Sequence, residues 1–600
     1  MRGNQATFAR GRTAPEAAVL RAAIVAVAVV QAVVLGLLAR RGHWLSDDLE
    51  FLVQGGRGFA PSELLTPLND HIAPGLRFVY ATFAELAPLN WDVTVAWRIL
   101  LQALAIVLLG LLLLRLLGSS WWVLIGTVVY ALTSLSMPSF MSLSSGVNNL
   151  PAHVFGLLLL HATVDWSTGH RRRAVAYGPL SLLISLTCWE KSGLILVTAL
   201  ALSLYLREVP LRVWLRRTWP YAAALTASIV AFGILYATHG NPSAGRLPGW
   251  SDLVELAGRS FAVPLGALAG GPWTWSRSGA FGLADAPAVV PVLGGIVAAV
   301  LLVIAWRRDR RVLLLWAAVG VYTAVTLMLV SYGRFSVFGS AFTVHYHYWS
   351  DLAIPLTLAV VLTARSMPAV RFAPFVAAGA LLAWTVGAVV SLATFAQLWD
   401  DNPARPYFST LRAELEAAGP AVNLWDTPLP GTVATVALAR DPRISPVLRT
   451  AGIPFQLQSS SSEPRMVDET GRIRPAHLTT WAKAVVPPKG KKFCSVHLQG
   501  AHTITLPLRA TTTDHPTAKW FAKVSYLSIR EHTVEVELVG TNGRAVAVPA
   551  SAAAWPASLA NAYLGPAPAT DLAAVRIRTT DPDSNLCIGG VEIGLPQVSQ

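Results

Sequence analysis

The chain has 600 residues, of which 54% are hydrophobic and only 13% are charged, and its mean hydropathy is +0.50. This composition excludes a disordered protein, a collagen-like protein and an ordinary water-soluble enzyme. The net charge of +14 would fit nucleic-acid binding, but from Asp400 onward 19 basic residues stand against 17 acidic ones. The excess therefore lies in the apolar part of the chain, where basic residues orient membrane spans. We expect a lipid bilayer, and no nucleic acid, as partner.

Apolar runs recur between residues 17 and 398 and predict about eleven transmembrane helices, because each run can cross a hydrocarbon core of about 30 Å. The predicted spans are 17–39, 95–117, 121–138, 149–165, 174–189, 192–206, 218–238, 287–306, 312–331, 350–364 and 372–397. Arginines cluster in alternate connections, near residues 171–173, 207–217, 307–311 and 365–371. This pattern predicts a cytoplasmic N-terminus and an extracytoplasmic C-terminal region. The preference for Arg over Lys, 40 to 7, suggests a GC-rich bacterial genome, so we expect a bacterial plasma membrane.

The exported region after residue 398 has a different pattern. We expect a transmembrane domain over residues 1–398, a mixed α/β segment with a linker over 399–475, and a jelly-roll-like β-sandwich over 476–600. The sandwich is indicated by short alternating segments at 493–498, 502–508, 520–529, 532–539, 545–548, 573–579 and 586–593. Cys494 and Cys587 lie in the first and the last of these segments. Because an exported compartment permits disulfides, we expect these two cysteines to pair.

An acidic pair, Asp47-Asp48, follows the first span and opens the first of three long outer connections, 40–94, 239–286 and 332–349. Two adjacent carboxylates can deprotonate an acceptor hydroxyl or bind a divalent cation such as Mg²⁺ or Mn²⁺. The alternative is structural: Ser46 or one aspartate could cap a helix over residues 49–54. One aspartate would suffice as a cap, so the pair favours catalysis or metal binding.

Further along the same connection stand Asn69-Asp70-His71 and then Arg77. The acid and the imidazole could complete a metal site or orient a donor phosphate. The alternative is a loop that leads into a capped interfacial helix over residues 74–87. The sequence leaves both interpretations open.

A second ionisable pair, Glu190-Lys191, lies between two predicted spans, and Lys191 is the only lysine among the first 482 residues. Ionisable groups at membrane depth are costly and indicate function. Lysine could place a compact positive charge on a phosphate, whereas the structural alternative is an ion pair that closes a helical hairpin.

The third outer connection carries Arg334 at the end of a span and an aromatic run from His345 to Trp349. Arg334 is well placed to bind a phosphate, and the aromatic residues could line a groove for a sugar or a prenyl chain. An aromatic belt at the membrane interface would explain the same residues.

In the second outer connection, Trp273 and Trp275 offer rings for sugar stacking. Anchoring of a re-entrant loop is the alternative, and the sequence favours it.

The acidic pair after the first span, the long first connection, the span count and the exported β-domain together resemble the GT-C superfamily of membrane glycosyltransferases. The chain is most similar to a bacterial branch in which the acidic pair is followed by an Asn-acid-His element. This resemblance implies transfer of a sugar from a polyprenyl-phosphate donor to a cell-envelope glycan or glycolipid on the outer membrane face, commonly with inversion at the anomeric carbon.

The resemblance also suggests roles for the residues named above. Asp47 or Asp48 would be the catalytic base, and Asp48 and His71 would be candidate metal ligands. The expected donor-phosphate ligands are Arg334, Lys191, Arg77 and His347. The expected substrate contacts are Asp70, His71, Glu190, Tyr348, Asp351, Trp273 and Trp275.

Two other functions fit parts of the sequence. A transporter or flippase for a lipid-linked glycan would use intramembrane charges as a pathway, but the sequence has no clear internal repeat and its acids cluster outside the spans. A non-enzymatic scaffold could bind envelope glycan through its exported region, but it would leave the acidic pair unexplained. The sequence therefore predicts a polytopic α-helical membrane glycosyltransferase of GT-C type with a C-terminal β-sandwich.

Overall fold

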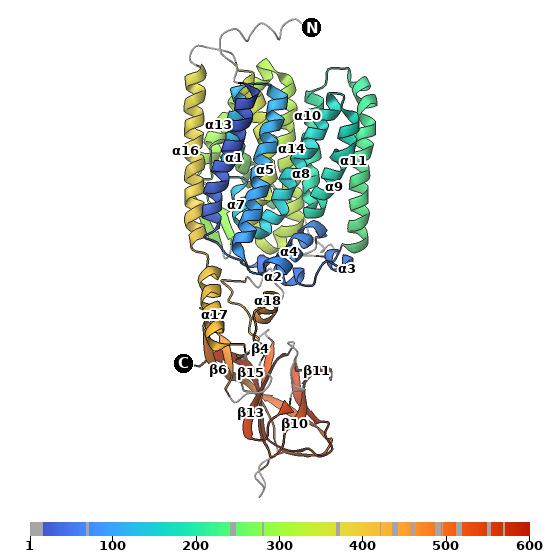
Figure 1. Ribbon diagram of the computed structural model, residues 1–600, viewed down its shortest axis with the longest axis vertical. Helices are drawn as coiled ribbons and strands as arrows, with labels where there is room; N and C mark the ends of the chain where they lie inside the picture. Colours follow the sequence, from blue (N-terminus) through green and yellow to red (C-terminus); the bar gives the residue numbers. More distant parts are fainter. Residues whose placement is uncertain are drawn as a thin grey trace. The chain divides into compact units, whose positions relative to one another are not determined.

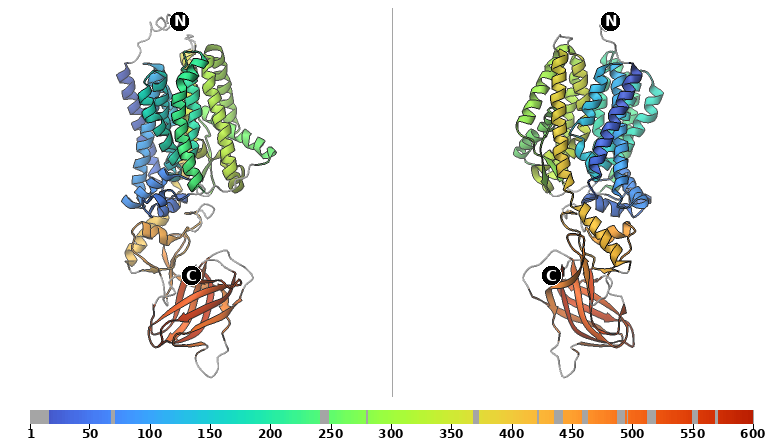
Figure 2. Two further views of the ribbon diagram at one scale, coloured as in Figure 1. Left: turned by 90° about the vertical axis from the view of Figure 1, so that its right-hand side faces the viewer. Right: turned by 60° about the vertical axis from the view of Figure 1, so that its left-hand side comes forward.

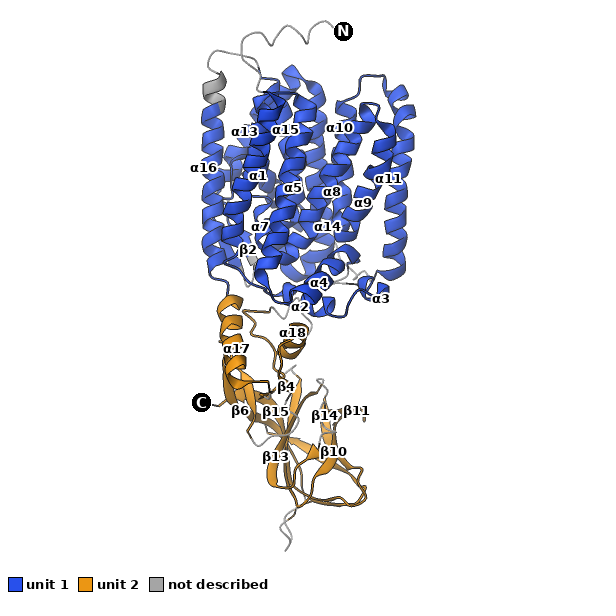
Figure 3. Ribbon diagram, viewed as in Figure 1, with its two compact units in different colours: residues 1–402 blue, residues 403–600 orange. Residues whose placement is uncertain are grey.

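The computed structural model describes residues 16–67, 71–240, 248–278, 281–367, 373–420, 422–434, 442–457, 463–486, 494, 496–511, 519–548, 554–567 and 571–599. The chain divides into two compact units, residues 1–402 and 403–600 (Figure 3). The first is helical and the second is rich in strands. The predicted fold class, a polytopic α-helical membrane unit followed by a β-sandwich, is confirmed.

The first unit is a bundle of helices, because an apolar run can satisfy its backbone polar groups within a bilayer only as a helix. Its longer helices are α1 (Ala17–Ala39), α5 (Trp91–Leu117), α8 (Leu143–Ser167), α9 (Arg171–Cys188), α11 (Leu211–His239), α12 (Trp250–Leu268), α13 (Val289–Arg308), α14 (Leu313–Phe338) and α16 (Ala373–Asp400). The shorter ones are α6 (Trp121–Leu132), α10 (Ile195–Tyr205) and α15 (Ala353–Arg365). Residues from all of these helices except α16 form a connected apolar core. The ribbon views show the helices side by side (Figures 1 and 2).

Among the described residues, seven helical stretches are long and apolar enough to cross a membrane. The predicted number of eleven is not confirmed, because α6, α10 and α15 have only 12, 11 and 13 residues. A helix needs about 20 residues to span the hydrocarbon core, so these three fall short by themselves.

Two hydrogen bonds join arginine-rich turns of the first unit to distant segments. Arg311 donates to the backbone oxygen of Arg207 at 3.2 Å, and Arg365 donates to that of Leu116 at 3.1 Å. At the other ends of the helices, Arg41 forms a 2.8 Å ion pair with Asp400. The chain after α16 therefore starts at the same end of the bundle as the first long connection, as the span pattern predicted.

The long connections contain further elements. The first holds α2 (Asp47–Gly55), α3 (Pro61–Leu64) and α4 (Pro74–Leu86), which lie at one end of the bundle (Figure 1). The second holds the hairpin β1 (Trp275–Ser278) and β2 (Phe281–Ala284) after α12. Helix α12 was not expected, because Asp252, Glu255 and Arg259 interrupt its apolar run.

Short helices complete the unit. They are α7 (Met137–Met141) between α6 and α8, η1 (Glu190–Leu194) between α9 and α10, η2 (Arg310–Val312) before α14, and η3 (Gly339–Val344) and η4 (Tyr346–Leu352) before α15. The break around α7 is informative: α6 ends at Leu132, and α8 begins at Leu143, six residues earlier than the predicted span. The serine-rich chain between them is consequently not part of a regular span, and its residues Ser134, Ser136 and Ser139 are buried.

The second unit begins with α17 (Ala404–Ala418), followed by β3 (Asn423–Leu424), α18 (Ile444–Thr450), β4 (Gln456–Leu457) and β5 (Arg465–Val467). Its remaining strands are β6 (Ile473–Ala484), β7 (Val496–Gln499), β8 (Thr503–Ala510), β9 (Trp520–Ser528), β10 (His532–Gly540), β11 (Ala545–Ala547), β12 (Ala554–Trp555), β13 (Leu559–Ala567), β14 (Leu572–Thr579) and β15 (Asn585–Val598).

These strands form an antiparallel sandwich. The order β11-β10-β14-β8 continues through β6 into β15-β9-β13. Strands such as β7 and β10 alternate buried and more exposed residues. The main core includes Val524, Val536 and Ile577, and a second cluster includes Phe521 and Tyr563. Alternation is the pattern expected when one face of each strand is buried.

The sequence missed β6 and β13 but anticipated the other long strands. The predicted linker and the predicted boundary at residue 475 overlap the start of β6, which is a central strand of 12 residues. Strand β13 contains Gly565 and Pro566, and both residue types are rare within strands. The predicted disulfide between Cys494 and Cys587 is present, with a Cα–Cα distance of 5.4 Å.

Candidate active site

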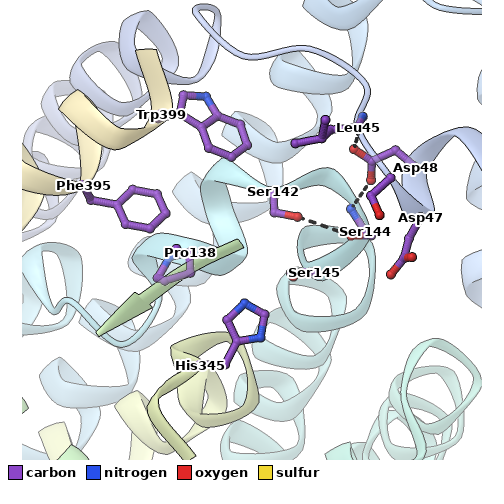
Figure 4. A pocket seen from close by; sticks show the side chains of 12 residues that line it. Leu45, Asp47, Asp48, Pro138, Ser142, Ser144, Ser145, His345, Phe395 and Trp399 are labelled. Atoms are coloured by element: carbon purple, nitrogen blue, oxygen red, sulfur yellow. Dashed lines mark hydrogen bonds between the residues drawn. The ribbon is translucent and has the colours of Figure 1, made fainter. Parts of the chain in front are cut away.

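The acidic pair opens helix α2. Ser46 precedes the helix, but its side chain makes no capping hydrogen bond, so it does not cap the helix with its hydroxyl. Its backbone has a φ of 54° and a ψ of −118°, a conformation that costs a residue other than glycine on the order of 1–3 kcal/mol. After this turn the two carboxylates point in different directions. Asp48 points toward Leu45, and Asp47 points away from both Leu45 and Asp48 (Figure 4).

Asp48 is held by three hydrogen bonds and is only 3% exposed. Its carboxylate accepts from the backbone N–H of Leu45 at 3.2 Å, from that of Ser144 at 2.7 Å, and from the Tyr80 hydroxyl at 3.2 Å. Burial raises the pKa of Asp48 to about 6, although these hydrogen bonds and the charge of Arg98 act in the opposite direction. Asp48 thus connects the first loop to α4 and α8.

Arg98 is fully buried in α5 and supports the segment that Asp48 contacts. Its guanidinium donates to the backbone oxygens of Phe140 at 2.9 Å and Met141 at 2.5 Å, and it lies 4.4 Å from the centre of the Trp91 ring. A charge within a membrane helix is costly unless it has such partners. Arg98 therefore fixes α7 just before α8, whose first turn supplies the Ser144 N–H.

Asp47 differs from its neighbour because its carboxylate has no hydrogen-bond partner among the described residues, and its Oδ1 is buried. Burial, then the negative charges of Asp48 and Glu50, raise its pKa to about 7, while the positive charge of Arg334 lowers it. A carboxylate with a pKa near neutrality can accept a proton from a hydroxyl in the physiological range. By geometry and by charge, Asp47 is the candidate general base.

A pocket lies beside the acidic pair. It is lined by Leu45, Ser46, Asp47, Asp48, Pro138, Ser142, Ser144, Ser145, Gly282, His345, Phe395 and Trp399. The carboxylates lie on one side and the Phe395 and Trp399 rings on the other (Figure 4). Rings and hydroxyls together suit a sugar, which offers an apolar face and several hydroxyl groups.

On the side of Asp47 toward α14, four of the predicted residues meet. Arg334 donates to Nε2 of His71 at 2.9 Å, and Nδ1 of His71 forms a hydrogen bond with Glu190. The Tyr348 hydroxyl also hydrogen-bonds with Arg334, and burial raises the pKa of that phenol. The structure thus brings together Arg334, His71, Glu190 and Tyr348, and the charge of Arg334 acts on Asp47.

Lys191 has a different environment from the one predicted. Its Nζ forms a 2.6 Å ion pair with Asp351 and donates to the backbone oxygen of Tyr348 at 2.5 Å, and the Lys191 and Asp351 side chains are each only 5% exposed. Asp351 also accepts a 2.5 Å hydrogen bond from Tyr322. The Lys191 ammonium and the Asp351 carboxylate therefore neutralise each other. This geometry favours the structural alternative, although the partner of Lys191 is Asp351 and not Glu190.

Arg77 is also occupied by the protein. Its guanidinium donates to the backbone oxygens of Thr66 at 2.6 Å and Pro67 at 3.1 Å, and to the Gln54 side chain at 3.0 Å. Only 4% of the residue is exposed. These contacts hold the first loop, so the geometry does not favour Arg77 as a phosphate ligand.

His347 lies beside Tyr348, with their ring centres 3.7 Å apart, and beside His345 at 3.9 Å. Burial, then the positive charges nearby, lower the pKa of His347 well below its usual value. A neutral imidazole brings no charge to a phosphate. Its Nδ1 is buried without a partner among the described residues, so it can still offer one hydrogen bond.

Trp273 and Trp275 anchor the second connection to α16, as the favoured alternative predicted. The backbone N–H of Trp273 donates to the Ser391 hydroxyl at 3.0 Å, and the Trp275 indole donates to the Ser391 backbone oxygen at 2.9 Å. The Trp275 ring packs edge-on against Tyr346 and Phe395. A role of these rings in sugar stacking remains a prediction.

The predicted metal ligands do not meet. Asp48 binds backbone N–H groups and Tyr80, whereas His71 lies between Glu190 and Arg334. Within the described ranges, no group of three or more His, Cys, Asp or Glu side chains could hold a metal ion. Asp70 lies outside the described residues.

Sequence reasoning missed several residues of this site. Tyr80 and Arg98 act through contacts with segments far away in the chain, and Phe395 and Trp399 belong to a helix that looked like an ordinary span. One signal was available for Ser144: the serine-rich stretch from Ser134 to Ser145 is too polar for a regular membrane span.

Comparison with solved structures gives only a weak similarity. No family model and no curated protein matches the chain. Among solved structures, it is similar to the arabinosyltransferase EmbB from Mycobacterium smegmatis, with 14% sequence identity and a TM-score of 0.30. The match covers 96% of this chain and 64% of that one, so the chain spans less than two thirds of that protein's length. At this identity and TM-score, the similarity does not identify the reaction of this chain.

Proposed function

We propose that this protein transfers a sugar from a polyprenyl-phosphate donor to a hydroxyl of a cell-envelope glycan or glycolipid, on the outer face of the plasma membrane. The observation that carries this proposal is the position of Asp47. Its unpartnered carboxylate lines a pocket of rings and hydroxyls, and it also lies within the field of the Arg334 guanidinium. A base between an acceptor pocket and a phosphate-binding cation is the arrangement that glycosyl transfer requires.

In the proposed reaction, Asp47 takes the proton of the acceptor hydroxyl. At the same time, the oxygen of that hydroxyl forms a bond with the anomeric carbon of the donor. The bond from that carbon to the phosphate oxygen breaks, and its electron pair stays with the polyprenyl phosphate, whose new negative charge Arg334 balances. Asp48 has its carboxylate in three hydrogen bonds and cannot readily act as a nucleophile. A single displacement with inversion follows.

The cations near Asp47 favour a monophosphate over a diphosphate. Among the described residues around the site, Lys191 is paired with Asp351, and Arg77 and Arg98 are held by backbone oxygens. Arg334 differs from these residues because its described partners are the His71 imidazole and the Tyr348 phenol, and not an acid or a backbone oxygen. One available cation matches the single negative charge of a phosphodiester.

The described part of the sandwich offers a glycan polar contacts and not exposed aromatic rings. In the described part of residues 473–598, every Trp, Tyr and Phe side chain is buried: Trp481, Trp520, Phe521, Tyr526, Trp555 and Tyr563. Within this described part, no exposed ring is available for a sugar to stack on.

The donor class can be tested without knowing the sugar. In lipid nanodiscs, the full chain should bind undecaprenyl monophosphate at least about tenfold more tightly than undecaprenol, because each charge-assisted hydrogen bond contributes about 1.5–3 kcal/mol. Arg334→Gln should remove most of this preference. The matched control is Arg259→Gln, another arginine of the outer connections, which pairs with Glu255 and Ser340.

Binding can be measured by native mass spectrometry, with undecaprenyl diphosphate as a third ligand. Tighter binding of the diphosphate would contradict the one-cation argument. Equal binding of monophosphate and alcohol would overturn the proposed donor. Transfer itself is then assayed with a panel of radiolabelled polyprenyl-phosphate pentoses and hexoses.

The pH dependence of transfer should report Asp47. A base must be deprotonated, so kcat/KM should rise about tenfold per pH unit below the pKa of about 7 and level off above it. In Asp48→Asn the rise should move to lower pH, because the Asp48 charge is one of the causes that raise this pKa. A profile that is flat from pH 5 to 8 in the wild type would contradict the role of Asp47.

A further inference from the structure

The hydrogen bond between Glu190 and His71 joins residues that are 119 positions apart, yet neither has a direct contact with Asp47 among the described interactions. We propose that Glu190 is a positioning residue of the phosphate subsite: through His71 it aims the guanidinium of Arg334. This inference rests on the proposed function and assigns to Glu190 a task that the sequence left open.

The first step of the argument is the protonation pattern of His71. A guanidinium can only donate hydrogen bonds, so Nε2 of His71 must accept the one from Arg334. A neutral imidazole with Nε2 as acceptor carries its proton on Nδ1, and Nδ1 is the atom that faces the Glu190 carboxylate. Glu190 therefore selects the tautomer that can receive Arg334, as carboxylates do for histidines in other sites.

The second step is the framework that brings the two residues together. Gly75, at the start of α4, packs so closely on the end of α9 that a Cβ there would lie 2.7 Å from the sulfur of Cys188. His71 lies just before this contact and Glu190 just after it. On the other side, the buried Lys191–Asp351 pair fixes η1 to η4. Lys191 thus anchors the turn, and Glu190 contacts His71 at the site.

The third step concerns Arg334. One of its terminal nitrogens is directed to His71, and its side chain also hydrogen-bonds with Tyr348. An arginine side chain has about 2 kcal/mol of rotamer entropy, and a guanidinium that is already oriented loses less of it on binding an anion. Without the hydrogen-bond acceptor on His71, the Arg334 guanidinium would keep its positive charge but would no longer be held in one orientation.

The test uses binding of undecaprenyl monophosphate to the full chain in nanodiscs. Glu190→Ala should weaken binding about tenfold, as is typical when the partner of a ligand-orienting histidine is removed. Glu190→Gln should stay within about twofold of the wild type. Its amide oxygen can accept from Nδ1, and its nitrogen can take the place of Oε2, which has no described partner. The control is Glu255→Ala, an exposed acid of the outer connections.

A double-mutant cycle separates positioning from general damage. If Glu190 acts through His71, the double variant His71→Phe with Glu190→Ala should bind no more weakly than His71→Phe alone. Should Glu190→Ala fail to fold, Glu190→Met fills the same space without an acceptor and replaces it.

The outcomes distinguish the two proposals. If the wild type does not prefer the monophosphate over undecaprenol, the proposed function falls, and the positioning role falls with it. If the wild type has this preference but Glu190→Ala binds normally, or Glu190→Gln binds as weakly as Glu190→Ala, only the role of Glu190 is overturned. Additive losses in the cycle would also overturn it.

Discussion

Replacing Asp47 by asparagine should abolish transfer and stabilise the protein at the same time. The loss should be about a hundredfold to ten-thousandfold, the usual contribution of a general base. The gain follows from linkage. The folded-state pKa of Asp47 is about 7, above the unfolded value of 3.8, so folding favours the protonated carboxyl. The part of the free energy of unfolding that depends on Asp47 is therefore fully present below about pH 4 and is lost as the pH rises through 7. Asparagine removes this cost, which is on the order of 1–3 kcal/mol at pH 8.

The experiment measures transfer and thermal unfolding of Asp47→Asn at pH 5 and pH 8. The rise in Tm should be larger at pH 8, where the wild-type carboxylate is ionised. Asp92→Asn is the matched control, because Asp92 is an exposed acid at the start of α5 that pairs with Arg40. Wild-type transfer by Asp47→Asn would exclude this residue as the base.

Replacing Lys191 by methionine should destabilise the protein strongly. The change would leave the Asp351 carboxylate buried with Tyr322 as its remaining described side-chain partner. Breaking a buried ion pair by removing one member costs about 3–5 kcal/mol, because the other charge stays buried without compensation. The yield of folded protein and its Tm should both fall.

The double variant Lys191→Met with Asp351→Asn decides between a structural and a phosphate-binding lysine. It removes both charges, so the Tm and the binding of undecaprenyl monophosphate should largely recover. A lysine that binds the donor would give the opposite result: a normal Tm for Lys191→Met and lost binding that the second substitution does not restore. Tm and monophosphate binding are measured on the same nanodisc samples.

Much of the architecture could be predicted from the sequence because the signals are local. The apolar runs from α1 to α16 predicted a helical membrane unit, and alternation in β7, β9 and β10 predicted the sandwich. Boundaries failed where local patterns are ambiguous. Helix α12 was not predicted because charged residues interrupt its apolar pattern. The start of β6 was assigned to a linker because that stretch is polar.

The residue types of the candidate site were also visible, but their roles were not. Asp47 and Asp48 are adjacent residues of the same type, so the sequence does not distinguish their roles. The backbone turn at Ser46 and the N–H of Ser144 make one of them a connector and leave the other free. Likewise, Arg77 and Arg334 looked like equal cations, yet one is held by loop carbonyls.

The sequence by itself determined that this is a helical membrane protein followed by a β-domain, because hydropathy, charge and period are properties of a few adjacent residues. Only the tertiary structure decided which charged groups are available to a substrate. The partner of Lys191 is 160 residues away and that of His71 is 119 residues away. Such pairs depend on close packing between distant helices, as at Gly75 and Cys188, and no local pattern encodes them.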